Sequence, residues 1–293
     1  MAESFSLHQY PFLPKQITIE GGHRISCVDE GQGKTVVFLH GNPSWSYLYR
    51  NLINALRVSY RCIAPDHLGC GLSDKPQKYP YRLINHIDNL EQVLDRLEVR
   101  NCVLVMHDWG GAIGMGWAGR HADRVDGLVV MNTAAFRSTR IPRRIAVCRW
   151  PLIGPLMVRG MNAFAGAAIH MAVTRKMVPE VAAGFLFPYD SWDNRVAVLR
   201  FVEDIPLHES HPSWSELVRV EKGLELLREK PMLLCWGGRD FCFNEVFYRE
   251  WQHRFPDARC YYFPEAGHYL LEDAFEEVRD KIVGFLVACG NGR

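Results

Sequence analysis

The chain has 293 residues, of which 48% are hydrophobic, so it is long enough for one large core or for a core domain that carries a sizeable insertion. Its 34 basic and 33 acidic residues give a formal net charge of +1, which argues against a nucleic-acid-binding protein and against a general attraction to membranes. Nine scattered cysteines without a C-x-x-C pair predict reduced thiols, a cytoplasmic location and no structural zinc.

The first part of the chain predicts an α/β fold. The start, MAESFSLHQYPF, has no basic residues followed by an apolar run, so no signal peptide is expected. QITIEG and HRISCVDEG then alternate apolar and polar residues around Gly21 and Gly22, which predicts an antiparallel hairpin. Short apolar runs follow, separated by helix-like segments: TVVFLH (35–40), CIAPD (62–66), VLVM (103–106), GLVVMN (127–132) and MLLCWG (232–237). This order predicts a mostly parallel central sheet with helices on both faces.

Residues 136–226 interrupt this pattern, because no β-like run separates their helical segments and seven prolines punctuate them. We therefore expect an inserted helical cap at 136–226, between a first core part at 1–135 and a second at 227–293. The β/α pattern resumes in the second part with MLLCWG, a helix near 244–254, RCYYF and a closing helix at 275–288. The apolar stretch 161–173 is too short to span a bilayer, so no transmembrane segment is expected.

The run VLVM leads into His107, Asp108, Trp109 and two glycines, followed by a helix-like segment. A sharp turn from strand to helix raises its central residue above the sheet, and in α/β-hydrolases that residue is the nucleophile. An aspartate alone at this place caps a helix. Trp109 and the paired glycines favour a functional turn instead, since they allow close backbone approach at the expense of helix propensity. Glycines within 114–119 match G-x-G-x-x-G, but they fall inside the predicted helix, so we expect them to serve packing.

Three further residues follow other predicted strands. Asn42 comes after His40-Gly41, where an α/β-hydrolase has a backbone N–H of the oxyanion hole, although a plain turn residue is an alternative. His268 lies in the loop after RCYYF, the place of the general base. Asp240 follows MLLCWG and is the expected acid that orients the histidine, with an Asx turn as the alternative. The order nucleophile, acid, histidine is that of an α/β-hydrolase.

Five segments resemble the haloalkane dehalogenase family over nearly the whole chain: HGNPSWSYLYRNLI (40–53), PDHLGCGLSDKP (65–76), HDWGG (107–111), WGGRD (236–240) and AGHYLLED (266–273). The resemblance implies an α/β-hydrolase fold with a cap, no cofactor and no metal. It also implies that Asp108 is the nucleophile, His268 the base and Asp240 the acid. Asn42 and Trp109 would bind the leaving halide through their side chains and the oxyanion through their backbone N–H groups. The alternative position of the acid is occupied by Asn132. This residue, together with Asp240 as the acid and Asn42 as the halide partner, gives a combination that resembles subfamily III of the dehalogenases.

A second resemblance concerns the cap and its borders. NTAAF (132–136), PYDSWDNR (188–195) and FVEDIPL (201–207) are similar to segments of the bacterial β-lactone decarboxylases of olefin biosynthesis. The leading expectation is hydrolysis of haloalkanes through an alkyl-enzyme ester on Asp108, which gives alcohol and halide. The alternative is decarboxylation of a dialkyl β-lactone to a long-chain cis-alkene and carbon dioxide. An epoxide hydrolase is a third option, disfavoured because its cap presents two tyrosines and residues 137–225 contain only Tyr189.

Other cap features are weighed in the same way. RSTRIPRRIAVCR (137–149) has five arginines and no acid, which indicates a solvated surface or a docking site for an acidic partner or an anionic membrane. The aromatic residues Phe164, Phe185, Phe187, Trp192 and Phe201 are expected to divide between cap core and pocket wall. His208 and His211 are three apart, not four as in H-E-x-x-H, so no metal is assigned. The expected partners are a small apolar substrate and halide, with a homo-oligomer or pathway enzymes as further options.

Overall fold

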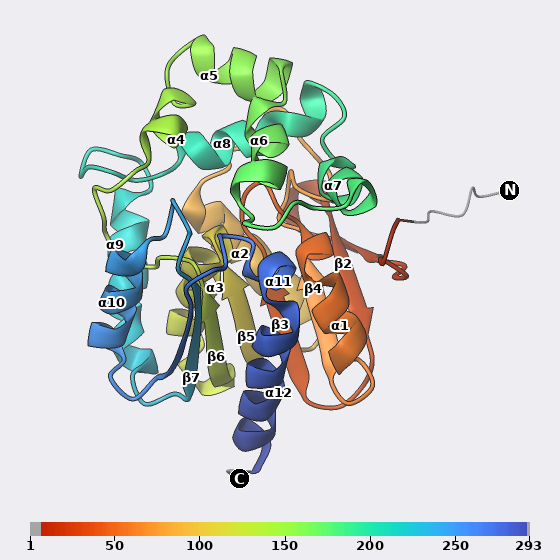
Figure 1. The fold of residues 1–293 in the computed structure, drawn as a ribbon, viewed down its shortest axis with the longest axis vertical. Helices are drawn as coiled ribbons and strands as arrows, with labels where there is room; N and C mark the ends of the chain where they lie inside the picture. The colour runs from red at the N-terminus through yellow and green to blue at the C-terminus, as the bar shows by residue number, and fades with distance from the viewer. Residues whose placement is uncertain (1–6, 292–293) are drawn as a thin grey trace, which may run out of the picture.

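The computed structural model, which describes residues 7–291, is built around an eight-stranded sheet (Figure 1). The strand order is β1-β2-β4-β3-β5-β6-β7-β8. The pairs β1·β2 and β2·β4 are antiparallel, and all the other pairs are parallel. The strands are β1 (Lys15–Thr18), β2 (Arg24–Glu30), β3 (Thr35–Leu39), β4 (Arg61–Pro65), β5 (Cys102–His107), β6 (Val125–Met131), β7 (Met232–Gly237) and β8 (Arg259–Phe263). The predicted hairpin and the predicted parallel strands are confirmed.

Alternation along the strands explains why both faces of this sheet are covered. In β3, Val37 and Leu39 belong to one hydrophobic cluster, whereas Val36 and Phe38 belong to the other. The first cluster packs under α2, α3 and α10, and the second under α1 and α12. The helices of the core are α1 (Arg50–Leu56), α2 (Leu83–Arg96), α3 (Trp109–Arg120), α10 (Glu245–Arg254), α11 (Leu270–Asp273) and α12 (Phe275–Asn291). The fold is therefore the predicted α/β-hydrolase fold.

Between β6 and β7 the chain is helical, and α4 to α8 lie over one end of the sheet (Figure 1). These helices have their own small cluster of buried residues around Val158, Tyr189 and Val198. The helices of this region are α4 (Arg143–Val147), α5 (Ile153–Pro155), the π-helical turn η4 (Leu156–Gly160), α6 (Ala163–Met171), α7 (Pro179–Leu186), α8 (Val196–Glu203) and α9 (Trp214–Gly223). The last of them, α9, adds Leu217 and Val220 to the core cluster under α3. Treating 136–226 as one cap remains a prediction.

Short 3-10 turns complete the described part of the chain: η1 (Glu20–Gly22), η2 (Ser46–Tyr49), η3 (Ala122–Arg124), η5 (Asp193–Arg195) and η6 (Leu224–Leu227). None of the helices in residues 7–291 is long and apolar enough to cross a lipid bilayer. The signal-peptide expectation depends on the first residues of the chain, and residues 1–6 lie outside the described residues, as do 292–293.

The glycines of α3 explain how this helix approaches the sheet. A Cβ on Gly110 would lie 2.0 Å from the Leu39 carbonyl oxygen, and one on Gly114 would lie 2.6 Å from Met106 Sδ. Both distances are far below van der Waals contact, so a larger residue would push the helix away from β3 and β5. The G-x-G-x-x-G pattern thus lies inside α3 and serves packing, as the sequence predicts.

Candidate active site

Asp108 stands at the turn between β5 and α3. Its backbone has φ 51° and ψ −128°, a conformation that residues with a side chain rarely adopt. The surrounding backbone holds the turn: Asp108 N–H donates to the Asn132 carbonyl at 3.2 Å, and the Thr133 hydroxyl donates to the Asp108 carbonyl. The Asp108 side chain makes no N-cap hydrogen bond to α3. The geometry matches a nucleophile turn rather than an N-cap.

Gly41 allows the chain after β3 to pass close to this carboxyl group. A Cβ at Gly41 would lie 2.0 Å from Asp108 Oδ1, so no side chain fits there without moving the aspartate. The close approach brings the Asn42 N–H to 2.7 Å from Asp108 Oδ1. The Trp109 N–H also lies near the carboxyl group and lowers its pKa. Two backbone donors therefore point at one carboxylate, which is the arrangement of an oxyanion hole.

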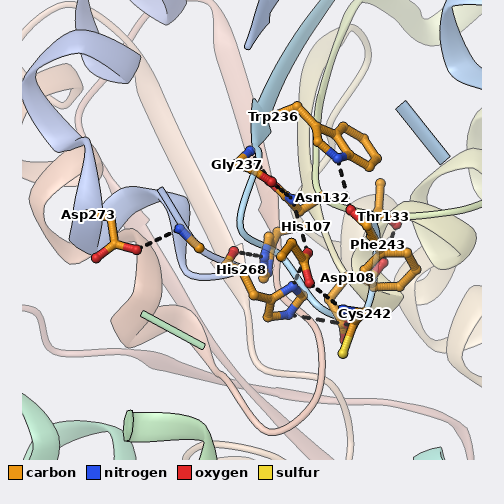
Figure 2. Close-up of polar contacts among 12 residues, drawn as sticks. His107, Asp108, Asn132, Thr133, Trp236, Gly237, Cys242, Phe243, His268 and Asp273 are labelled. Carbon is orange, nitrogen blue, oxygen red and sulfur yellow. Dashed lines mark hydrogen bonds and ion pairs between the residues drawn. The ribbon is translucent and has the colours of Figure 1, made fainter. Parts of the chain in front are cut away.

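His268, which Figure 2 shows beside Asp108, and Asp240 complete the predicted set. His268 Nε2 lies 3.8 Å from Asp108 Oδ2, and His268 Nδ1 lies 2.7 Å from Asp240 Oδ2. The carboxylate of Asp240 also accepts the Cys242 N–H at 2.6 Å. Asp240 thus fixes the imidazole so that its other nitrogen faces Asp108. The structure brings Asp108, His268 and Asp240 together, as the sequence predicts.

The loop that carries His268 is anchored on both sides. His107 donates its Nε2–H to the His268 carbonyl at 2.8 Å, and Asp273 accepts the Gly267 N–H at 2.7 Å (Figure 2). Asp273 also accepts the Thr174 N–H at 2.9 Å, so the same carboxylate joins the loop to the cap region. Burial lowers the pKa of His107 to about 3, which keeps it neutral and available as a structural donor.

Asn132 has a role that sequence reasoning did not predict. Its Nδ2 donates to Asp240 Oδ2 and to the Gly237 carbonyl, each at 3.0 Å, and its Oδ1 accepts the Gly237 N–H at 2.8 Å. The sequence placed Asn132 only as the residue at the alternative acid position. Its location at the end of β6, beside β7, is the signal that could have indicated these contacts, since the two strands are neighbours in the sheet.

Burial and charge act against each other in the three titratable side chains. Burial raises the pKa of Asp108 above its ordinary value, although His268 and the N–H groups of Asn42 and Trp109 favour the ionised form. Burial would also raise the pKa of Asp240, but the His268 imidazole and the N–H of Cys242 hold it below its ordinary value. For His268, burial is outweighed by the two carboxylates, which raise its pKa. The two carboxyl groups therefore stabilise the protonated form of His268 relative to an isolated imidazole.

The predicted leaving-group pair lies beside the nucleophile. The indole of Trp109 packs against Phe201 with ring centroids 5.2 Å apart, and Trp109 lines the same cavity as Asp108. Asn42 Nδ2 donates to the Val198 carbonyl at 3.1 Å, while its Oδ1 is buried without a partner in the same described part of the chain. One amide hydrogen of Asn42 is therefore held by α8, and the other remains for a ligand.

A cavity of about 390 Å³ extends from these groups under the cap helices. This volume lies in the range of about 300–1,000 Å³ that small-molecule sites occupy. Its walls are largely apolar. Outside the predicted cap they include Asn42, Asp108, Trp109, Phe247 and His268, and from the predicted cap Phe136, Ile145, Met157, Phe164, Ala168, Met171 and Val202. The site is thus a largely apolar chamber whose polar lining includes the candidate nucleophile and its neighbours, together with Arg140 and Arg144.

The cap aromatics divide differently from the sequence expectation. Phe164 lines the cavity, and Phe185 and Phe201 are buried, as expected of wall and core residues. Phe187 and Trp192, each 46% exposed, belong to neither group, so that part of the expectation is wrong. Their positions depend on how short helices pack on one another, which residue type alone does not determine.

Tyr189 does not line the cavity. It is buried, and its hydroxyl faces the Ser44 carbonyl at 3.5 Å. The cap therefore presents no tyrosine to the candidate nucleophile within the described residues, which argues against epoxide hydrolysis. No group of three or more metal-binding side chains with suitable geometry occurs between residues 7 and 291. His208 and His211 instead bond to Ser210 and to the Glu203 carbonyl.

Comparison with known proteins agrees with this site. Residues 34–152 match the family described as the alpha/beta hydrolase fold. The cis-3-alkyl-4-alkyloxetan-2-one decarboxylase of Shewanella oneidensis is 44% identical over 272 residues, which cover 90% of this chain and 86% of the relative. Haloalkane dehalogenase 2 of Mycobacterium bovis is 32% identical over 279 residues, which cover 94% of this chain and 95% of that dehalogenase. The chain belongs to the α/β-hydrolase family that contains the haloalkane dehalogenases.

Solved structures support the same family. The haloalkane dehalogenase DbeA of Bradyrhizobium elkani superposes with a TM-score of 0.88 at 25% identity, covering 96% of this chain and all of the dehalogenase. The likeness therefore extends over the sheet and the cap region together. As a member of this family the chain is an enzyme of the α/β-hydrolase class, and both resemblances stated from the sequence are confirmed. Which of the two reactions it catalyses is a separate question.

Proposed function

We propose that this enzyme decarboxylates cis-3-alkyl-4-alkyloxetan-2-ones, giving a cis-alkene and carbon dioxide. The observation that carries the proposal is the difference in similarity between the two kinds of relative: 44% identity to a decarboxylase against 32% to a dehalogenase, each over at least 90% of this chain. From the sequence, dehalogenation is the leading expectation because most weight is given to the halide-binding pair. Both reactions use the same candidate residues, so the full-length similarity is the better guide to the substrate.

The cavity adds support from its walls. NTAAF supplies Ala134 and Phe136 to the lining, and FVEDIPL supplies Val202, Ile205 and Pro206. These are two of the three segments that resemble β-lactone decarboxylases. Residues of the segments that resemble the β-lactone decarboxylases therefore lie where the alkyl chains of a substrate would contact the protein. Apolar walls suit such chains, because burying apolar surface is the main contribution to their binding.

The first step that we propose is attack by Asp108 on the saturated ring carbon that carries the ring oxygen. Oδ1 is held by the Asn42 N–H, so we assign the attack to Oδ2. The carbon–oxygen bond of the ring breaks with inversion, and its electron pair leaves a carboxylate on the neighbouring carbon. Asp108 is then an alkyl ester. The indole N–H of Trp109 and the second amide hydrogen of Asn42 would bind the new carboxylate.

The second step returns Asp108 to its starting state. The bond between the carboxylate and its carbon breaks, its electron pair forms the alkene, and the ester bond to Asp108 breaks as carbon dioxide leaves. Inversion followed by departure of the two groups from opposite sides gives a cis-alkene from a cis-lactone. No water is consumed. An apolar chamber favours this step, because a carboxylate without hydration loses its charge by decarboxylating. The imidazolium of His268 stabilises the released Asp108 carboxylate.

The test is to incubate the protein with a cis-3,4-dialkyloxetan-2-one and to measure alkene and carbon dioxide. Bromide release from 1-bromoalkanes is measured in parallel. Asp108→Ala should abolish alkene formation, while Glu225→Gln, at a side chain that is 73% exposed, should leave it unchanged. Bromide release without alkene would contradict the proposal and return dehalogenation to first place.

The nine cysteines are unpaired in the structure, which supports a reducing compartment, and a cytoplasmic location remains part of the proposal.

A further inference from the structure

The outer end of the cap exposes large apolar side chains. α5 forms the outermost part of the molecule at the cap end (Figure 1). We call residues 150–161, from before α5 to just after η4, the cap tip. Its exposed apolar residues, with exposed fractions between 42% and 86%, are Trp150, Leu152, Ile153, Leu156 and Met161. Single exposed apolar residues are ordinary, but five within twelve residues mark an interaction surface.

These side chains form a continuous surface rather than isolated points. Leu156 N–H donates to the Leu152 carbonyl at 3.2 Å, which holds these two exposed leucines in one turn. A Cβ on Gly160 would lie 3.3 Å from Leu156 Cδ1 and 3.6 Å from Trp192 Cζ3, which brings half-exposed Trp192 next to the cap tip. Leu152 has φ 66°, an unfavourable conformation for a bulky residue, and it is the most exposed of the set.

The segment around the cap tip carries only positive charge. Between residues 137 and 179 the sequence has eight cations and no aspartate or glutamate: Arg137, Arg140, Arg143, Arg144, Arg149, Arg159, Arg175 and Lys176. Because the whole chain has a net charge of +1, the remainder is net negative. Arg137 and Arg159 form ion pairs, with Glu221 and Asp193. Arg143 has no ion-pair partner within the described part of the chain, so its charge is free to meet an external anion.

The same segment borders the cavity. Arg140, Ile141, Pro142, Arg144 and Ile145 contribute to its walls. The short stretch that precedes the cap tip therefore reaches the chamber in which Asp108 lies.

We propose that the cap tip docks on the surface of an anionic phospholipid bilayer. The apolar side chains would enter the interface, and the arginines would contact lipid phosphates. Exposed apolar residues combined with cations and no acids are the composition of interfacial segments. A second copy of this chain is a poor occupant, because a symmetric contact would place the same cations face to face. A dialkyl lactone dissolves in the bilayer, so docking would bring the enzyme to its substrate; this part of the inference rests on the proposed function. The docking itself does not depend on the proposed function.

The experiment is co-sedimentation of the protein with phosphatidylcholine vesicles, with and without phosphatidylglycerol. Binding to the anionic vesicles is expected. Leu152→Gly with Leu156→Gln should weaken it by about tenfold or more, because two interfacial leucines are lost. Glycine suits the backbone at Leu152, so this variant should fold. Arg143→Gln should weaken binding by about fivefold, and Arg143→Lys should not. None of these positions lines the cavity, so turnover of a short-chain lactone in solution serves as the control.

A second readout locates the contact. Lipids brominated near the headgroup should quench part of the tryptophan fluorescence, and Trp150→Phe combined with Trp192→Phe should remove most of that quenching, since these two lie at or beside the cap tip whereas Trp45, Trp117, Trp236 and Trp251 are fully buried. Binding that is absent, equal on neutral vesicles, or unchanged in the leucine variant would overturn the proposal. Two other results would also overturn it. One is a dimer in sedimentation velocity that the leucine variant abolishes while vesicle binding is unchanged. The other is capture of an acidic protein that the leucine variant abolishes while vesicle binding is unchanged. Vesicle binding needs no turnover, so its failure is distinguishable from failure of the decarboxylase proposal.

Discussion

Replacing Gly41 with alanine tests the contact between the nucleophile and the chain after β3. The new Cβ would lie 2.0 Å from Asp108 Oδ1 and 2.4 Å from its Cγ, whereas ordinary contact begins at 3.4 Å. The carboxyl group must therefore retreat by more than 1 Å or the Asn42 N–H must leave it. Loss of one such donor, or a displacement of this size, reduces turnover by roughly 10² to 10³. The crowding should also lower the free energy of unfolding by about 1–3 kcal/mol.

The assay is alkene formation at saturating lactone, with thermal unfolding measured on the same samples. Gly284→Ala is the matched control, because a Cβ there meets nothing within 4 Å and alanine suits the interior of α12. It should keep full turnover and gain about 0.5–1 kcal/mol of stability at most. If Gly41→Ala folds and turns over as the unaltered enzyme does, the Asn42 N–H contact is not part of the catalytic geometry.

Three other predictions follow from the site. Asn132→Ala leaves buried backbone groups of Gly237 and one bond of Asp240 unmade, so denaturant unfolding should show a loss of about 2–4 kcal/mol; a change near zero would contradict the assigned bonds. Asp240→Asn removes the charge that raises the pKa of His268, so an NMR titration should find that pKa lower than in the unaltered protein, and an unchanged value would refute the coupling. Burial raises the pKa of Asp108, and only the ionised carboxylate attacks, so alkene formation should decline as pH falls through a pKa above the ordinary 3.8; a rate that persists below that value in folded protein would count against this nucleophile.

The grouping of the three candidate catalytic residues could be predicted because strand ends and chain order carry the information. Asp108, Asp240 and His268 follow β5, β7 and β8, and the carboxyl ends of parallel strands meet at one edge of the sheet. The bonds of Asn132 to Gly237 and Asp240 could not be predicted in the same way. They join residues more than 100 positions apart and depend on β6 and β7 being neighbours, which a sequence pattern does not establish.

The cap was less predictable for a physical reason. Its helices are short, and their few buried residues do not give a periodic pattern that fixes which side faces the core. Asn42 illustrates the consequence, since the sequence indicated its backbone role but not the bond from its amide to Val198 on α8. The exposure of Leu152 and Leu156 likewise depends on how the cap tip packs against the rest of the cap.

The central claim is that the ester on Asp108 is resolved by loss of carbon dioxide and not by water. Multiple turnovers of a cis-dialkyl lactone in water enriched in ¹⁸O, followed by mass analysis of the peptide that contains Asp108, test it directly. Hydrolysis of an enzyme ester places an oxygen of water in the aspartate carboxyl group, whereas decarboxylation returns the original oxygens. The account predicts alkene accumulation with no label in Asp108. Label in Asp108, together with a β-hydroxy acid in place of alkene, would contradict it.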